Sequence, residues 1–501
     1  MHNIDDATLL SYVQFLLKGA YMTKNSIISL VTLTLASTLY GVEPSITQQA
    51  ELKIQQQSQV SLNKLQESLD NSEVLEGVVI ASPSKEKPNY FYHWTRDGGI
   101  VMQSLNQIKS SNTFSQNSLF NNFSERLRKY VNAEMIMEKN GYGEPKHLVT
   151  GKIFDEPWGR PQNDGTAFRV LNYIRVLEQE ANRPDRDQKF ESTIKNSIIQ
   201  NLYYLSEAIH KADVEPWEEV RGFHFFNRLI QAKAFKEAKR YFSQVELGVD
   251  ARTMLNENIT LLFGMLGDHV VTKSDIISAS LGVKPFEDKG KVSNLDISTL
   301  LAILYTDFPE FEVQKDGTTL KMSFSPDNDQ LQNTVYQLVN SFQNIYPINH
   351  QGLKGVLIGR YPEDVYDGVG FEGGNPWILS TLALGEYYAR LFSHLKAVQK
   401  LTVSNLNFEF YKQLLLKSSP AFVLNRGNFN SESDEYKTIL QSLRKEAIAQ
   451  TERVLYHTPT DHNLAEQLNK SSGFSQGARE LSWSHVSFLR THYYLEQTLS
   501  Q

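Results

Sequence analysis

The residues best suited to acid–base chemistry are three glutamates within five positions, in residues 214–220 (VEPWEEV). Three carboxylates this close together are costly unless solvent or a ligand uses them. If Pro216 opens a helix, Glu215 and Glu218 share one face, and Glu219 points about 100° away. A close like charge and the adjacent Trp217 both disfavour ionisation of a carboxyl group, as a general acid requires. An acidic helix start that interacts with the helix dipole explains the same residues, so two interpretations stay open here.

A second segment with chemical potential is residues 89–97 (NYFYHWTRD), which ends in Arg96 and Asp97. Charged groups form strong hydrogen bonds with sugar hydroxyls, and aromatic rings stack on the apolar faces of sugars. The alternative is a buried salt bridge under a helix start. Residues 158–165 (WGRPQNDG) and 359–364 (GRYPED) have the same character, with a rigid turn as their alternative. Asn163 and Asp164 are also candidate caps for the helix that follows.

The elements that must position these segments are predicted to be helices. Residues 45–71 are polar, Gln-rich and free of Gly and Pro, which indicates a long first helix. Two apolar stripes at helical spacing follow: Ala167, Val170, Leu171, Ile174 and Leu177, then Ile194, Ile198, Leu202 and Leu205. Another helix is predicted to start with Asn375 as N-cap and Pro376 as its first residue, and to run through residues 377–395.

The chain as a whole is predicted to be all-α. Sustained alternation typical of strands is absent from the sequence, although residues 283–328 are more mixed and are expected to contain a few strands or a loop excursion. The Gly- and Pro-rich segments between the helices are dense in Trp, Arg and acidic residues, and such loops on a rigid scaffold are where function tends to concentrate. We therefore expect a helical toroid that carries its site on loops.

Composition excludes several classes of function. The 501 residues contain no Cys, which excludes disulfides, thiolate ligands and thiol nucleophiles. The net charge of −7 and the lack of a basic run argue against nucleic-acid binding. No cluster of metal-ligand residues has a convincing spacing, so neither a metal nor another cofactor is expected. A hydrophobic content of 40% allows a sizeable core without crosslinks.

The N-terminus carries an apolar stretch at residues 27–39 that is too short and too polar for a comfortable membrane span. It resembles a secretory signal if translation starts at Met22, with Lys24 as the basic region and small residues near Ala36 and Gly41. An ordinary N-terminal helix is the alternative. We expect residues 1–44 to be an extension with this signal, a secreted or periplasmic location rather than a cytoplasmic one, and no stable membrane insertion.

Taken in order, the segments resemble the glucoamylases, glycoside hydrolase family 15, from Tyr90 to the C-terminus. The resemblance lies in eight short runs, which are 90–97 (YFYHWTRD), 143–146 (GEPK), 158–165 (WGRPQNDG), 215–222 (EPWEEVRG), 359–364 (GRYPED), 374–377 (GNPW), 465–467 (AEQ) and 478–483 (ARELSW). It implies one catalytic domain, residues 45–501, with the fold of an (α/α)6 barrel. It also implies an exo-acting, inverting hydrolase that releases β-D-glucose from the non-reducing ends of α-1,4-glucans, with slower α-1,6 cleavage.

The same resemblance implies roles for individual residues. Glu218 is expected to protonate the glycosidic oxygen and Glu466 to activate the attacking water. Glu219 is expected to bind the neighbouring sugar and to help position the acid. Arg96, Asp97 and Arg360 are expected to hold the terminal glucose, while Tyr90, Trp158 and Trp377 wall the site, and Trp94, Trp217 and Asp364 complete the predicted substrate-binding set. Glu215 counts as catalytic too, as the alternative base.

The chemistry of inversion agrees with a distant base. An inverting glycosidase keeps its two carboxyl groups roughly 6.5–9.5 Å apart to admit a water molecule. Adjacent Glu218 and Glu219 cannot easily lie on opposite faces of one sugar ring. Glu466 lies 248 positions after Glu218 (466 − 218 = 248).

Some features depart from the family pattern or leave the substrate open. Glu215 stands where many members have Asp, and Asn163 replaces a residue that is often basic. The chain ends 18 residues after Trp483 (501 − 483 = 18), so we expect no C-terminal starch-binding module and a preference for soluble or short α-glucans or glycogen. Trehalose, isomaltosides or dextran are alternative substrates, for which residues 359–374 and 283–328 would set the choice. A non-catalytic carbohydrate-binding protein is an alternative of another class. We expect a monomer.

Overall fold

The computed structural model describes residues 46–243, 248–271, 275–285, 291–315 and 317–499. The predicted N-terminal extension, with its signal segment after Met22, lies outside the described residues. In the part of the chain that is described, no helix is long and apolar enough to span a membrane.

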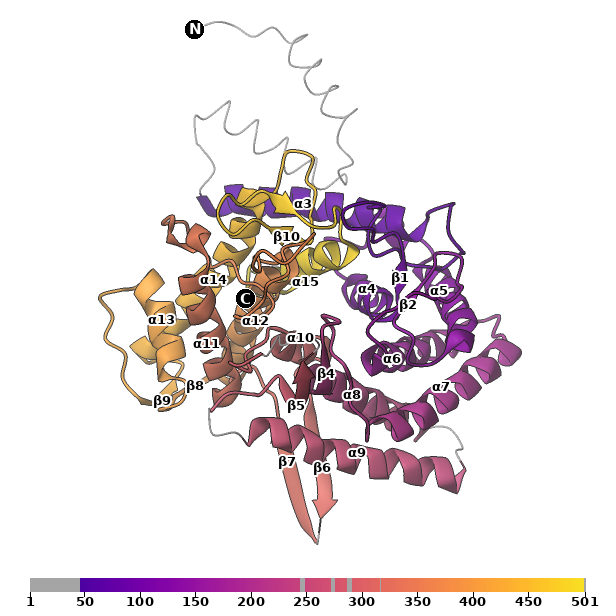
Figure 1. Cartoon of the computed structure of the whole chain (residues 1–501). Coiled ribbons are helices and arrows are strands. Elements are labelled where there is room, and N and C mark those ends of the chain that lie inside the picture. The colour runs from indigo at the N-terminus through magenta and orange to yellow at the C-terminus, as the bar shows by residue number, and fades with distance from the viewer. Residues whose placement is uncertain (1–45, 244–247, 272–274, 286–290, 316, 500–501) are drawn as a thin grey trace, which may run out of the picture.

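Six helices of the described chain form a closed inner ring. Helix α4 packs on α6, α6 on α8, α8 on α10, α10 on α12, α12 on α15, and α15 on α4 again (Figure 1). Their bounds are α4 Thr95–Ile108, α6 Asn163–Glu180, α8 Phe225–Phe242, α10 Ser298–Tyr305, α12 Ile378–Val398 and α15 Ser482–Leu499. Every residue of α10 is buried, as expected for a helix that is enclosed on all sides.

Outer helices cover this ring. Helix α3 packs on α15, α5 and α7 on α6, α9 on α8, and α14 on α12, while α13 lies between α11 and α14. Their bounds are α3 Ile46–Leu69, α5 Phe123–Met137, α7 Gln188–Ala208, α9 Val249–Val270, α11 Asp329–Ile345, α13 Phe408–Ser418 and α14 Asp434–His457. They are amphipathic; α11 buries Leu331, Val335, Leu338, Val339 and Phe342 along one stripe. The two layers make an (α/α)6 barrel, and the predicted fold class is confirmed.

Short antiparallel strands decorate the barrel. They pair as β1 His93–Trp94 with β2 Lys146–His147, β6 Glu310–Lys315 with β7 Thr318–Ser323, β8 Lys400–Val403 with β9 Gly427–Asn430, and β10 Gln467–Leu468 with β11 Ser475–Gln476. A three-stranded sheet has the order β3 Asp213–Val214, β4 Val220–His224 and β5 Ser280–Pro285. Single 3-10 turns span Ser118–Phe120, Glu138–Asn140 and Pro347–His350. The mixed region 283–328 thus contains the end of β5, helix α10 and the β6–β7 hairpin.

The helix predictions hold for α3, α6 and α7, whose apolar stripes are buried. The predicted start at Asn375 is wrong, because α12 begins at Ile378 with Trp377 as its N-cap. The Asn375 side chain instead donates to the carbonyl of Asp367 and to Gln467, and accepts the backbone N–H of Lys470. Asn163 is the first residue of α6 and follows Gln162, so neither it nor Asp164 is the N-cap.

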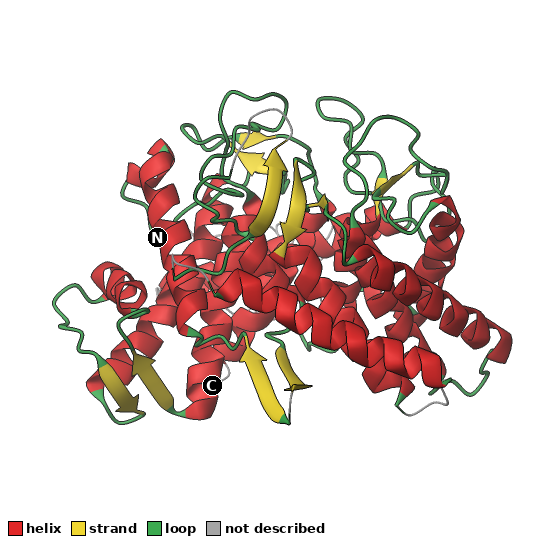
Figure 2. Ribbon diagram, turned by 60° about the horizontal axis from the view of Figure 1, so that its bottom comes forward, coloured by secondary structure: helices red, strands yellow, loops and turns green. Residues whose placement is uncertain are grey.

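Loops gather at one end of the barrel, at the top of Figure 2. Three inner helices start there: the segments just before or within the first turns of α4, α12 and α15 contribute residues to one cavity. The barrel therefore positions side chains from distant parts of the chain around a common space.

Candidate active site

A cavity of about 580 Å³ lies at this loop-rich end of the barrel. Eleven of the predicted site residues line it, which are Tyr90, Trp94, Arg96, Asp97, Trp158, Trp217, Glu218, Glu219, Arg360, Trp377 and Glu466. Glu215 and Asp364 are buried and do not line it. The cavity thus brings both predicted catalytic carboxylates together with most of the predicted sugar-binding set.

Residues 215–219 form the turn between β3 and β4, so Pro216 does not open a helix. The Glu215 carboxylate explains the turn: it accepts backbone N–H groups from Trp217 at 2.6 Å, Glu219 at 3.0 Å and Val220 at 3.1 Å. These bonds satisfy the amides of the turn with a buried carboxyl group. Glu218 adopts a φ of +69°, which aims its side chain into the cavity while Glu215 stays behind the turn.

The carboxylate of Glu218 is fixed through one oxygen. Its Oε1 accepts the indole N–H of Trp94 at 2.9 Å and the amide N–H of Gln162 at 3.0 Å. Arg96 Nη2 lies 3.8 Å from the same oxygen. Because Oε1 is already an acceptor of two hydrogen bonds, the proton of a neutral Glu218 belongs on Oε2.

Glu466 occupies a different environment, since its side chain is fully buried. Its Oε1 accepts the hydroxyl of Tyr90 at 2.9 Å, and because that hydroxyl has a single hydrogen, Tyr366 must be the donor in its 3.2 Å contact with Tyr90. Within the described residues, Oε2 has no hydrogen-bond partner. Burial raises the pKa of Glu466 to about 7, against the opposing effects of the Tyr90 hydrogen bond and the charge of Arg360.

A glycine beside Glu466 leaves room for its carboxylate. Gly477 has a φ of +74°, and a Cβ built there would lie 2.2 Å from Glu466 Oε2. A side chain at this position would therefore both strain the backbone and collide with the carboxylate. The lack of a side chain at Gly477 therefore lets the Glu466 carboxylate occupy this position.

Arg96 and Asp97 lie in the first turn of α4. They form a buried ion pair at a helix start, and they also line the cavity, so they fit both interpretations of the sequence. Arg96 Nη2 is 3.2 Å from Asp97 Oδ2, and Nη1 donates to Gln162 at 2.8 Å and lies 3.5 Å from Asp164. Burial raises the pKa of Asp97 to about 6, although the charge of Arg96 opposes the shift. Arg96 Nε and Asp97 Oδ2 are buried without a hydrogen-bond partner among the described residues, so the pair retains capacity for ligand hydroxyls.

Arg360 is oriented by a bidentate ion pair with Asp364, through Nε at 2.8 Å and Nη2 at 2.6 Å. Its Nη2 also donates to Glu219 at 2.7 Å, and the Tyr361 hydroxyl donates to the other oxygen of Glu219. Burial alone would raise the pKa of Glu219, but the charges of Arg360 and Lys291 outweigh it and lower that pKa. Asp364 therefore acts on Arg360 from behind the cavity wall.

A sequence model of the glycosyl hydrolases family 15 matches residues 56–493 of the chain. The chain belongs to glycoside hydrolase family 15. It is 30% identical over 474 residues to the intracellular sporulation-specific glucoamylase of Saccharomyces cerevisiae, covering 87% of this chain and 82% of that protein. It is 29% identical over 452 residues to the glucoamylase GLU1 of Saccharomycopsis fibuligera, covering 82% and 83% of the two chains.

Solved structures of family 15 have the same fold. A glucoamylase from Saccharomycopsis fibuligera superposes with a TM-score of 0.75 at 28% identity, over 89% of this chain and 95% of that chain. A family 15 glucoamylase from Hypocrea jecorina superposes with a TM-score of 0.73 over 88% of this chain and 71% of that chain. Its sequence identity is 24%, so this likeness supports the fold only.

Sequence reasoning missed several residues of this family 15 site. Trp483 lines the cavity and stacks on Trp217 with ring centroids 6.0 Å apart. Lys146 lies 3.7 Å from the ring centre of Trp158 and contacts three further rings, and burial lowers its pKa to about 8. Both stand inside runs of the family pattern, 478–483 and 143–146, so a signal for them was present. Tyr366 lies outside those runs, and only the fold brings it to the cavity.

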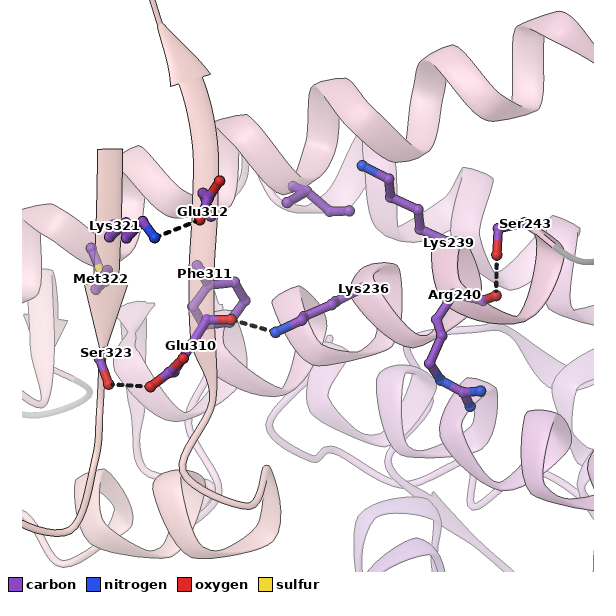
Figure 3. A pocket seen from close by; sticks show the side chains of 11 residues that line it. Lys236, Lys239, Arg240, Ser243, Glu310, Phe311, Glu312, Lys321, Met322 and Ser323 are labelled. Atoms are coloured by element: carbon purple, nitrogen blue, oxygen red, sulfur yellow. Dashed lines mark hydrogen bonds and ion pairs between the residues drawn. The ribbon is translucent and has the colours of Figure 1, made fainter. Parts of the chain in front are cut away.

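A second hollow of about 580 Å³ lies between α8, α9 and the β6–β7 hairpin of this family 15 chain (Figure 3). Two of its lysines have partners within the protein: Lys321 pairs with Glu312 at 3.0 Å, and Lys236 donates to the backbone carbonyl of Glu310. None of the predicted site residues lines it. Among the described residues, moreover, no group of three or more Asp, Glu or His side chains is placed to hold a metal ion.

Proposed function

We propose that the chain is an exo-acting, inverting glucan 1,4-α-glucosidase that releases β-D-glucose from the non-reducing ends of α-1,4-glucans. The observation that carries this proposal is the pair of carboxylates in one cavity with unlike surroundings. Glu218 borders the cavity with Oε1 engaged by two donors, and Glu466 is buried with Oε2 unpartnered. The names of the relatives, glucoamylases from several fungi, support the same activity.

The division of labour follows from these surroundings. Glu218 gives the proton on Oε2 to the glycosidic oxygen as the bond from that oxygen to the anomeric carbon breaks. Glu466 in its ionised form takes a proton from a water molecule, whose oxygen forms the new bond to the anomeric carbon from the opposite face. The products are β-glucose and a glucan shortened by one unit. Because Tyr90 occupies Oε1, Oε2 of Glu466 is the oxygen that accepts the proton.

The terminal glucose is bound by the charged residues at the start of α4 and by Arg360, all of which line the cavity. Glu219 is suited to the next sugar, because its ion pair with Arg360 keeps it ionised at the cavity surface. Trp158 and Trp377 supply apolar faces, and each has a buried indole N–H without a partner in the described chain. Hydrogen-bonding side chains and flat apolar rings together suit the binding of a glucose ring.

The proposal is tested by the configuration of the first product. Maltotriose, soluble starch, isomaltose and trehalose are incubated with the protein, and the anomeric proton of released glucose is followed by NMR. We expect β-glucose first, with α-1,4-glucans as the best substrates. Initial α-glucose would refute inversion, faster turnover of trehalose or isomaltose would reassign the substrate, and no turnover of any α-glucoside would refute the proposed activity.

Two isosteric variants test the roles of the carboxylates. Glu218→Gln and Glu466→Gln are each expected to lower kcat by at least about 100-fold, the scale of acid–base catalysis. Glu310→Gln, on the β6–β7 hairpin and outside the cavity, is the matched control and should retain full activity. Near-normal turnover by Glu466→Gln would remove it as the base.

We also propose export of the protein and a monomeric state. The signal pattern after Met22 supports export, although the Saccharomyces cerevisiae relative is named as intracellular. Mass spectrometry of the mature N-terminus tests the first point: an N-terminus retained at Met1 would contradict cleavage. Light scattering coupled to gel filtration tests the second against the chain mass of 57.2 kDa.

A further inference from the structure

Two large apolar side chains on the loop between Asp364 and Gly374 are exposed at the rim of the active-site cavity. Phe371 is 66% and Val369 is 63% exposed, and both line the cavity. Four tryptophans that line the same cavity, which are Trp94, Trp217, Trp377 and Trp483, are at most 6% exposed. A single exposed apolar residue needs no explanation, but a pair at the mouth of a binding site marks a contact surface.

This loop is rigidly built, which distinguishes it from a flexible surface excursion. The carboxylate of Asp367 accepts the backbone N–H groups of Val369 at 3.0 Å, Gly370 at 2.5 Å and Glu372 at 3.4 Å. The carbonyl of Asp367 accepts N–H donors from Asn375 at 3.1 Å and from Gln476 at 2.6 Å. The loop therefore presents its apolar side chains in a fixed place, at little entropic cost on binding.

The same loop contacts the residues that surround the predicted base, Glu466. Gly368 packs so closely on Gly477 that a Cβ there would lie 2.8 Å from it, and Gly477 borders the carboxylate of Glu466. On the cavity side, Tyr366 donates to Tyr90, which donates to Glu466, and the rings of Tyr366 and Phe371 have centroids 6.3 Å apart. Contacts thus lead from the base outward to Phe371 at the rim.

We propose that Phe371, with Val369 beside it, forms an outer subsite that stacks on a glucose unit beyond the two that flank the cleaved bond. This inference rests on the glucan hydrolysis proposed above. A glucan bound by its terminal glucose in the depth of the cavity must leave past the rim, and the apolar face of a glucose ring matches an exposed aromatic ring. The subsite favours longer malto-oligosaccharides, since maltose ends before it.

The test compares substrates of different length. In Phe371→Ala, the ratio of kcat/KM for maltopentaose to kcat/KM for maltose is expected to fall about 3- to 10-fold, the size of one aromatic contact. The loss should appear in KM. Phe371→Tyr, which retains a ring, should restore the ratio. Phe474→Ala is the matched control, because Phe474 is 77% exposed and does not line the cavity.

The outcomes separate this subsite from the underlying activity. If the native protein turns over maltose and Phe371→Ala leaves the ratio unchanged, the subsite is refuted and the proposed function stands. An equal loss on both substrates would assign the loop a structural role and also refute the subsite. No turnover of either substrate by the native protein would refute the proposed function. Binding of maltopentaose and maltose to Glu218→Gln, measured by calorimetry with and without Phe371→Ala, checks the same ratio without turnover.

Discussion

The hydrogen bond between Tyr90 and Glu466 offers the sharpest test of the catalytic assignment. Tyr90→Phe removes the hydroxyl that donates to Glu466 Oε1 at 2.9 Å and retains the ring, which packs 5.3 Å from Trp94. The substitution therefore changes the electrostatics of the base with little change in packing. Its effect should appear in the pH dependence of the reaction.

The sign and size of the effect follow from the geometry. The Tyr90 hydroxyl stabilises the ionised form of Glu466, so its removal raises the pKa of a carboxyl group that burial has already raised. A hydrogen bond to a charged group contributes about 1.5–3 kcal/mol, and one pKa unit corresponds to about 1.4 kcal/mol. The pKa of Glu466 should rise by about one to two units. Because the base works in its ionised form, the acid limb of kcat/KM moves to higher pH by the same amount.

The assay is a pH profile of kcat/KM on maltose for the native protein and for Tyr90→Phe. The alkaline limb should stay in place, because the hydroxyl that the substitution removes donates to Glu466. Tyr366→Phe, one step further from the base, should shift the acid limb in the same direction by less. A uniform loss of activity with an unmoved acid limb would refute the assignment of Tyr90 as a partner of the ionised base.

Three further predictions concern the surroundings of the two carboxylates. Lys291→Met should lower the free energy of unfolding by about 3–5 kcal/mol in urea titrations, because it leaves buried Asp296, its partner at 2.7 Å, without a counter-charge; an unchanged midpoint would contradict this. Gly477→Ala should lower kcat at least about tenfold while circular dichroism stays native, because its Cβ would approach Glu466 Oε2; full activity would show that the carboxylate can move aside. Burial raises the pKa of Asp213 from 3.8 to about 7, so the native protein should lose stability as pH rises through that window. Asp213→Asn should lose less between pH 5 and 7, and an equal slope in urea titrations would argue against the raised pKa.

The fold was largely predictable from the sequence, because the spacing of apolar residues within each helix is a local pattern. The stripes of α6 and α7 repeat at 3.6 residues, and their apolar residues are those the barrel buries. The boundary of α12 was not predictable in the same way. Asn375 and Pro376 satisfy the local rule for a helix start, but the Asn375 side chain binds Gln467 and the amide of Lys470, which lie more than 90 positions away. Long-range partners overrode a local preference.

The acid turn illustrates a similar conflict. Pro216 followed by Trp217, Glu218 and Glu219 is compatible with a helix start. The flanking Val214 and Val220 belong instead to paired strands, and the segment between them is a hairpin turn. Branched residues at both ends were a readable sign of strands. The position of Glu466 had no local sign at all. Its burial and its partner Tyr90, 376 positions away, follow from tertiary structure.

The turn also explains why three glutamates can stand within five positions and why none of them replaces the base. Glu215 faces three backbone amides and, at 3.6 Å, Lys291; Glu219 faces Arg360. Burial raises the pKa of Glu215, whereas Arg360 and Lys291 outweigh burial and lower that of Glu219. The two environments shift the pKa values of Glu215 and Glu219 in opposite directions, so the two groups do not need to be ionised at the same time. Glu215 is enclosed behind the turn, so it cannot reach a water molecule in the cavity, and a single turn cannot present carboxylates to both faces of one sugar. The base must therefore come from another part of the chain, and Glu466, in the segment before α15, lines the same cavity.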